Sequence, residues 1–122
     1  MKLTSRHLPG VTLITLSGEV DAATSGYLET YVDRVRRDLH EHLIIDVSRL
    51  TFLDSSGLAV LLAAATLARA HGAALHLAGL QTRVARLLEI TGAWRAVTVY
   101  DHVEQAIAAV RALDRAEPTE PA

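Results

Sequence analysis

The sequence predicts an α/β fold: a mixed, mostly parallel sheet that opens with an antiparallel hairpin and is flanked by about four helices. Three observations predict it. Short apolar runs alternate with longer segments of helical spacing, as in chains that build parallel sheets through helical crossovers. Pro9-Gly10 divides the first two runs, and this pair is a turn signal between strands. One central run is apolar almost throughout, which is typical of a strand buried on both faces.

The N-terminal part of the chain is expected to contain the hairpin, a loop and a helix. Residues 3–8 and 11–16 are the two strands, and residues 18–21 are expected to form a loop. Thr24 or Ser25 is the expected cap of the helix that follows. That helix is predicted by apolar residues three or four positions apart, namely Leu28, Tyr31, Val32, Val35 and Leu39.

The middle of the chain is expected to hold the buried strand and a second helix. Residues 43–47 are the almost fully apolar run, and residues 48–54 are expected to be a loop. A helix follows over residues 56–70, with Gly72 ending it. This helix has no charge until Arg69 and is apolar nearly all round. It is therefore either a buried helix or a helix with an exposed apolar strip that contacts a partner.

The C-terminal part continues the alternation of strands and helices. A strand is expected over residues 74–78, a helix over residues 82–90 that ends at Gly92, and a last strand over residues 97–100. With the earlier elements, this order predicts right-handed crossovers between parallel strands.

A final helix and a short tail complete the expected organisation. Asp101 and Glu104 match a capping box, in which each side chain satisfies a free backbone N–H group at a helix start. Residues 1–114 are expected to form one domain. Residues 115–122 contain two prolines and little apolar surface, so we expect them to be a disordered tail.

Composition excludes several classes of function. The 122 residues suffice for one domain with its own core, and the formal net charge of -2 predicts no direct binding to nucleic acid. The absence of cysteine excludes disulfides and thiolate chemistry. Lys2 is the only lysine, so a phosphate-binding loop with its lysine and a Schiff-base lysine are both missing. The longest uncharged apolar stretch is too short to cross a bilayer, and we expect no membrane insertion and a cytoplasmic location.

The six histidines do not point to a metal or a catalytic triad. None has the spacing of a zinc-binding helix, and no serine lies in a Gly-x-Ser-x-Gly turn. Scattered, solvated histidines are the simpler interpretation. We therefore expect no cofactor, no metal and no enzymatic activity.

The segment richest in information is residues 53–58, Leu-Asp-Ser-Ser-Gly-Leu. It lies where a buried strand leads into a helix, which places Asp54 or Ser55 at the helix N-cap. The simplest interpretation is capping alone, since Asp and Ser are preferred N-cap residues.

The wider sequence resembles the STAS-domain anti-sigma factor antagonist family. The resemblance lies in motifs that occur in the family's order and spacing: Leu-Ser-Gly-Glu-Val-Asp at 16–21, Asp-Val-Ser at 46–48, the segment 53–58, Leu-Ala-Gly-Leu at 77–80, and the segments 84–88, 91–92 and 104–109. It covers nearly the whole chain except the tail, and it implies a STAS-like sheet and helices.

The resemblance also implies a function. Unphosphorylated members bind an anti-sigma factor that is also a serine protein kinase, and this binding frees a sigma factor. The kinase phosphorylates the serine after the motif's aspartate, here Ser55, the complex dissociates, and a serine phosphatase resets the system. The residues that the resemblance places at the partner-binding site are Asp21, Asp54, Ser56, Gly57 and Leu58.

Two alternatives remain beside this function. One is an unphosphorylated STAS subunit of a stress-signalling complex or a lipid-transport ABC assembly, in which Ser55 is a cap or an interface residue. The other is a small enzyme or nucleotide-binding protein of similar architecture. The missing Gly-rich phosphate loop argues against the second.

Overall fold

The computed structural model describes residues 1–116. In chain order its elements are β1 (Lys2–Leu8), β2 (Val11–Val20), α1 (Ser25–Val35), β3 (His42–Leu53), α2 (Ser55–Ala70), β4 (Leu75–Ala78), α3 (Thr82–Thr91), the 3-10 turn η1 (Ala93–Ala96), β5 (Thr98–Tyr100) and α4 (Val103–Ala116). The predicted succession of strands and helices is confirmed.

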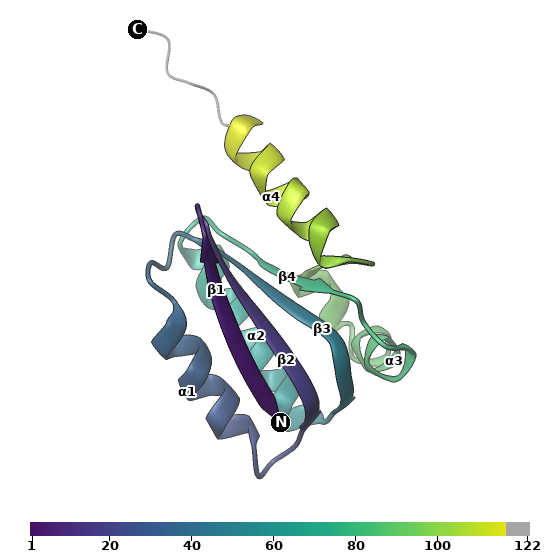
Figure 1. The fold of residues 1–122 in the computed structure, drawn as a ribbon. Helices are drawn as coiled ribbons and strands as arrows, with labels where there is room; N and C mark the ends of the chain where they lie inside the picture. The colour runs from purple at the N-terminus through teal and green to yellow at the C-terminus, as the bar shows by residue number, and fades with distance from the viewer. Residues whose placement is uncertain (117–122) are drawn as a thin grey trace, which may run out of the picture.

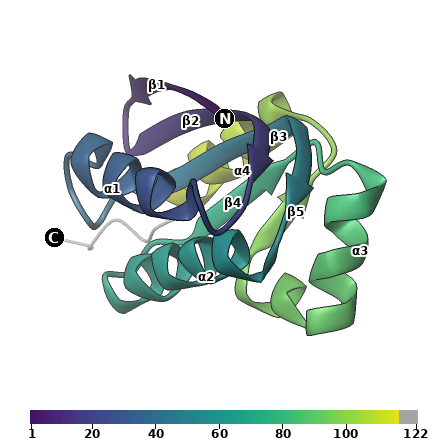
Figure 2. The ribbon, with the colours of Figure 1, turned by 90° about the horizontal axis from the view of Figure 1, so that it is seen from below.

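The five strands form one mixed sheet in the order β1-β2-β3-β4-β5. The hairpin pair β1 and β2 is antiparallel, and every other pair is parallel. Figure 1 shows the strands side by side with α2 behind them. Figure 2 shows α1, α2 and α3 on one side of the sheet and α4 on the other. The predicted fold class, a mostly parallel sheet with an N-terminal hairpin and four helices, is confirmed.

Successive residues of β3 supply the two hydrophobic cores. Leu43 and Ile45 belong to the larger core beneath α1, α2 and α3, whereas Ile44 belongs to a smaller core beneath α4. Side chains alternate between the faces of a strand, so a strand covered by helices on both sides has to be apolar at successive positions. This burial explains the continuous apolar run that predicted the strand.

Two of the predicted loops are strand. β2 continues to Val20, through the expected loop 18–21, and β3 continues to Leu53, through the expected loop 48–54. The two extensions pair with each other, as in the pair Val20 and Leu53, after register shifts. In β3 the inward residues after Val47 are Leu50 and Leu53, three positions apart, so the alternation that identifies a strand is lost there. In β2 the alternation continues to Val20, but Gly18 is a residue that strands disfavour, so the segment resembled a loop.

Smaller corrections concern the helix ends. α1 stops at Val35 and does not reach Leu39. At the start of α4 the Gln105 side chain accepts a hydrogen bond from the backbone N–H of His102 at 3.0 Å, so this cap lies one residue after the predicted Asp101 and Glu104 pair. α4 also enters the first two residues of the expected tail, and residues 117–122 of that tail lie outside the described residues.

The expectation of solvated histidines is wrong for His76. Its side chain is 2% exposed on β4, on the strand face opposite to Leu75 and Leu77. Its Nε2 lies 3.1 Å from Nδ1 of His42, and its Nδ1 lies 3.2 Å from the hydroxyl oxygen of Tyr100. A sequence of six scattered histidines gives no sign that strand pairing brings two of them together.

Candidate functional site

Asp54 is the N-cap of α2. Its Oδ1 accepts hydrogen bonds from the backbone N–H groups of Ser56 and Gly57, both at 3.0 Å, and from the Ser56 hydroxyl. Hydrogen bonds from the Ser56 hydroxyl and the Gly57 N–H lower the pKa of Asp54, because they favour the charged carboxylate. The carboxylate is therefore ionised at neutral pH and fixed in one orientation.

The two consecutive serines have different environments. Ser56 is half-buried, and its hydroxyl is hydrogen-bonded to Asp54. Ser55 is exposed in the first turn of α2, and within the described part of the chain its hydroxyl has no hydrogen-bond partner. Of the two hydroxyls, only that of Ser55 is therefore free to react with a group brought from outside.

Gly57 allows α2 to begin close against the sheet. A Cβ atom at this position would lie 2.5 Å from Cδ1 of Leu53 and 2.7 Å from Cγ1 of Val20, at the ends of β3 and β2. Leu58 is 5% exposed and belongs to the large core. Gly57 and Leu58 therefore lie beneath the surface and position the exposed residues above them.

The loop that contains Asp21 lies against this helix start. The Asp54 N–H donates to the Val20 carbonyl at 3.2 Å, and the Ala22 N–H contributes to the lowered pKa of Asp54. Asp21 caps its own turn, because its Oδ1 accepts from the Thr24 hydroxyl at 3.1 Å. The structure thus brings Asp21 and Asp54 into adjoining loops.

The same geometry brings two helix N-termini together. β2 and β3 are parallel neighbours that end at the paired residues Val20 and Leu53, and each is followed within a few residues by a helix, α1 or α2. Free backbone N–H groups and the helix dipole make such ends favourable places for negative charge.

The sequence identified Thr24 only as a possible helix cap. In the structure the Thr24 hydroxyl donates a hydrogen bond to the Asp21 carboxylate instead. Ser, Thr and Asp side chains commonly form such local bonds when they lie three residues apart.

One face of α2 continues the site as an uncharged strip. From Ser55 to Leu67 the exposed positions are Ala59, Ala63, Thr66 and Leu67, of which Leu67 is 36% exposed, and the first charged residue of the helix is Arg69 in its last turn. A groove of about 140 Å³ runs beside this strip, and Glu29 and Asp33 of α1 line its far side. The opposite face of α2 is buried. The buried interpretation is therefore confirmed for that face, and contact between the exposed strip and a partner remains a prediction.

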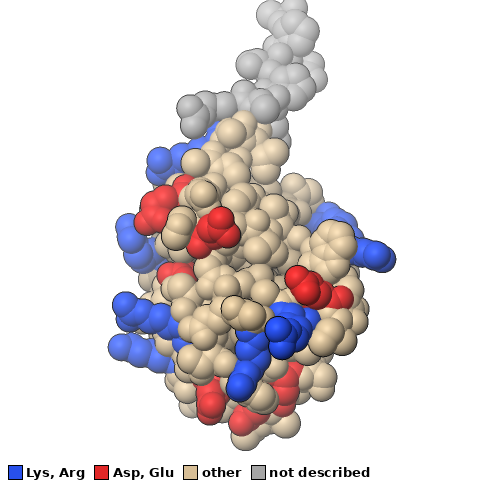
Figure 3. All heavy atoms as spheres, turned by 90° about the vertical axis from the view of Figure 1, so that its right-hand side faces the viewer, with Lys and Arg blue, Asp and Glu red and all other residues tan. Residues whose placement is uncertain are grey.

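Other kinds of site find no support in the described residues. Within residues 1–116, no three His, Asp or Glu side chains are placed to hold a metal ion. No helix in this part of the chain combines the length and the apolar character needed to cross a membrane. Figure 3 shows acidic and basic side chains interspersed on the face that it presents, which is unlike the basic stripe of a nucleic-acid-binding surface.

The comparison with protein-family models matches residues 2–106 to the STAS domain. This chain belongs to the STAS domain family. A relative with matching sequence is the anti-sigma F factor antagonist of Paenibacillus polymyxa, which is 31% identical over 88% of this chain and 92% of its own length.

Solved structures of anti-sigma factor antagonists have the same fold. An anti-sigma factor antagonist from Mycobacterium paratuberculosis is 31% identical, with a TM-score of 0.74 over 90% of this chain and 93% of its own. The anti-sigma factor antagonist SpoIIAA, solved in its unphosphorylated form, has a TM-score of 0.76 over 91% of this chain and 97% of its own. At 20% identity, SpoIIAA supports the STAS fold alone.

Proposed function

We propose that this STAS protein is an anti-sigma factor antagonist controlled by phosphorylation of Ser55. In the unphosphorylated form it binds an anti-sigma factor that is also a serine protein kinase, and a sigma factor is released. The kinase then phosphorylates Ser55 and the complex dissociates, and a serine phosphatase restores the binding form. The names of the relatives support the antagonist role, and the free, exposed hydroxyl of Ser55 is the observation that carries the choice of residue.

The site tolerates a phosphoryl group without unfolding. Such a group adds about −1.5 to −2 charges at neutral pH. It would stand at the N-terminus of α2, with the N-terminus of α1 close by, and both ends favour an anion. The switch therefore acts on binding and leaves the fold in place.

Binding is the property that phosphorylation disrupts. A partner that covers Ser55 would enclose a phosphoryl group together with the carboxylates of Asp54 and Asp21, and these like charges would lose water. Burying such uncompensated charge costs a few kcal/mol, which weakens binding by more than about a hundredfold. The two aspartates thus make the interface intolerant of a third negative group.

The proposed partner surface combines polar and apolar parts. Asp54 and Ser56 flank Ser55 in the chain, Asp21 lies in the loop that adjoins Asp54, and the α2 strip from Ala59 to Leu67 extends the surface along the helix. Gly57 and Leu58 contribute from beneath by fixing the helix start. A protein with this role has no catalytic residues of its own and acts in the cytoplasm, where sigma factors are found.

A comparison of four proteins in native cells tests the proposal: wild type, Ser55→Ala, Ser55→Asp and Ser56→Ala. Each is examined by intact-mass measurement and by recovery of bound partners. We expect one added phosphoryl group on wild type and on Ser56→Ala, and none on Ser55→Ala. Ser55→Ala should retain a kinase-like partner that Ser55→Asp loses.

A different outcome would contradict the proposed phosphorylation of Ser55. If no phosphoryl group is found under any growth condition and all four proteins recover the same partners, Ser55 is a helix residue only. The chain is then better explained as an unphosphorylated subunit of a larger assembly.

A further inference from the structure

β5 leaves one edge of the sheet unpaired. It is the last strand in the sheet order and pairs only with β4 among the described residues. The Gly79 N–H donates to the Tyr100 carbonyl at 2.9 Å, so the backbone groups of Tyr100 face β4. Because these groups alternate along a strand, the N–H and carbonyl of Val99 face the open edge. The Val99 side chain is 42% exposed.

The opposite edge of the sheet is protected in a way that β5 is not. β1 carries the exposed charged side chains of Lys2 and Arg6. Charged side chains on an edge strand discourage pairing with another chain. None of the three residues of β5, Thr98, Val99 and Tyr100, is charged.

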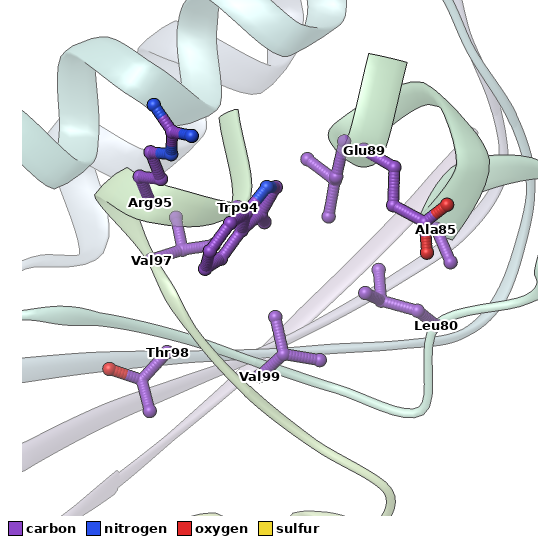
Figure 4. Close-up of a pocket in the computed structure, with 9 residues that line it drawn as sticks. Leu80, Ala85, Glu89, Trp94, Arg95, Val97, Thr98 and Val99 are labelled. Carbon is purple, nitrogen blue, oxygen red and sulfur yellow. The ribbon is translucent and has the colours of Figure 1, made fainter. Parts of the chain in front are cut away.

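An apolar hollow adjoins the open edge. It has a volume of about 570 Å³ and lies between α3, η1 and β5, with Leu80, Leu88, Trp94 and Val99 among its lining residues. Figure 4 shows the Trp94 ring standing above Leu80 and Val99, whereas the Arg95 side chain points away from them. Trp94 is 51% exposed, and Trp is enriched at the centres of protein interfaces.

The charges on either side of β5 are opposite in sign. Arg95 precedes the strand, whereas Asp101 and Glu104 follow it, and all three are exposed. In an antiparallel pair of identical strands, the start of each strand lies beside the end of the other. A second copy paired in this way would place Arg95 next to Asp101 and Glu104 of its partner, once on each side of the two-fold axis.

We infer that β5 is a self-association surface, at which two copies pair their β5 strands antiparallel about a two-fold axis through Val99. The sheet continues from one copy into the other, and the two Val99 residues exchange both backbone hydrogen bonds. The Trp94 rings close over the joined hollows. A two-fold contact requires a patch complementary to itself, and the opposite charges at the ends of β5 meet this requirement.

The strand is short, so the dimer is expected to be weak and to depend on concentration. The contact uses no residue of the Ser55 site. The proposal of a β5 dimer therefore does not depend on the proposed function.

The absence of cysteine from the chain allows a direct test. In a hydrogen-bonded antiparallel pair the two Cα atoms are about 5.5 Å apart, within the range found in disulfides, and a small adjustment of the two edge strands brings the Cβ atoms within bonding range. Purified full-length Val99→Cys is oxidised by air, and Ala59→Cys, on the exposed face of α2, is the matched control. We expect the Val99→Cys dimer to form at least about tenfold faster, because pairing brings its thiols together before they react.

Charge exchange supplies a second measurement that needs no cross-link. Sedimentation equilibrium of wild type, Arg95→Glu, and Arg95→Glu combined with Asp101→Arg gives the dimer dissociation constant of each. We expect Arg95→Glu to weaken the dimer by about tenfold and the exchanged pair to recover most of the loss. Circular dichroism confirms that each variant is folded.

Two results would overturn the inference. One is wild-type protein that remains monomeric up to millimolar concentration. The other is oxidation of Val99→Cys at the rate of Ala59→Cys, which would mean that any self-association uses another face.

Discussion

At the scale of single residues, the site depends on small side chains and on the direction of hydrogen bonds. Asp54 holds the first turn of α2 through two backbone N–H groups and the Ser56 hydroxyl, and this arrangement leaves the neighbouring Ser55 hydroxyl free. The resemblance singled out Ser55 through the motif Asp-Ser-Ser-Gly, and its phosphorylation remains a prediction. The hydrogen bond that ties the Ser56 hydroxyl to Asp54 was not predictable, because it depends on which hydroxyl turns toward the carboxylate.

The packing of Gly57 leads to a prediction at this scale. Gly57→Ala is expected to lower the free energy of unfolding by about 1–3 kcal/mol, because the added Cβ meets Leu53 and Val20. Gly26→Ala in α1 is the matched control, since nothing lies within 4 Å of a Cβ there. It should be neutral or stabilising by up to about 1 kcal/mol. Urea unfolding of both variants measures the difference, and equal effects would show that Gly57 has no packing role.

At the scale of elements, the regular segments were predictable and their ends were not. The apolar run at Leu43–Ile45 identified β3, because helices cover both faces of the sheet there. The extension of β3 to Leu53 depends on pairing with β2 across register shifts, and such pairing between distant segments leaves no local pattern. The contact between His76 and His42 was not predictable either, because it also depends on pairing between distant segments. His42 lies on the neighbouring strand β3.

The buried His76 predicts a pH dependence of stability. Burial, and to a lesser extent the nearby His42, lower the pKa of His76 from 6.5 to about 4. His42 Nδ1 accepts from the Ala74 N–H, so the neutral His76 donates from Nε2 and accepts from Tyr100 at Nδ1. As the pH falls, His76 is protonated near pH 6.5 in the unfolded chain but only near pH 4 in the folded protein. Stability should therefore be complete above about pH 6.5 and fall as the pH drops toward 4.

Urea unfolding between pH 7 and pH 5.5 measures this loss in a range where most carboxylates remain ionised. His76→Gln should show a clearly smaller decrease in the unfolding midpoint than wild type over this range. His40→Gln removes an exposed histidine and should retain the wild-type decrease. The same decrease in all three proteins would assign the pH dependence to other groups.

At the scale of the whole molecule, the proposed switch lies at the ends of two neighbouring strands of the sheet. Helices α1, α2 and α3 cover one face of the sheet and α4 covers the other (Figure 2), while the Ser55 hydroxyl remains at the surface. A charge added there meets helix N-termini and contacts no part of the core. The structure therefore favours a switch that changes affinity and keeps one shape.

Such a switch makes a prediction for the whole fold. Ser55→Asp should unfold at the wild-type temperature or up to about 4 °C above it, since an acidic side chain in the first turn of a helix stabilises by up to about 1 kcal/mol. Hydrogen exchange should show the same protection in the sheet and in α2, even though partner binding is lost. Ser55→Ala serves as the uncharged control. A large loss of protection confined to α2 in Ser55→Asp would mean that the added charge releases the partner by unfolding the helix, and a switch of unchanged shape would then be wrong.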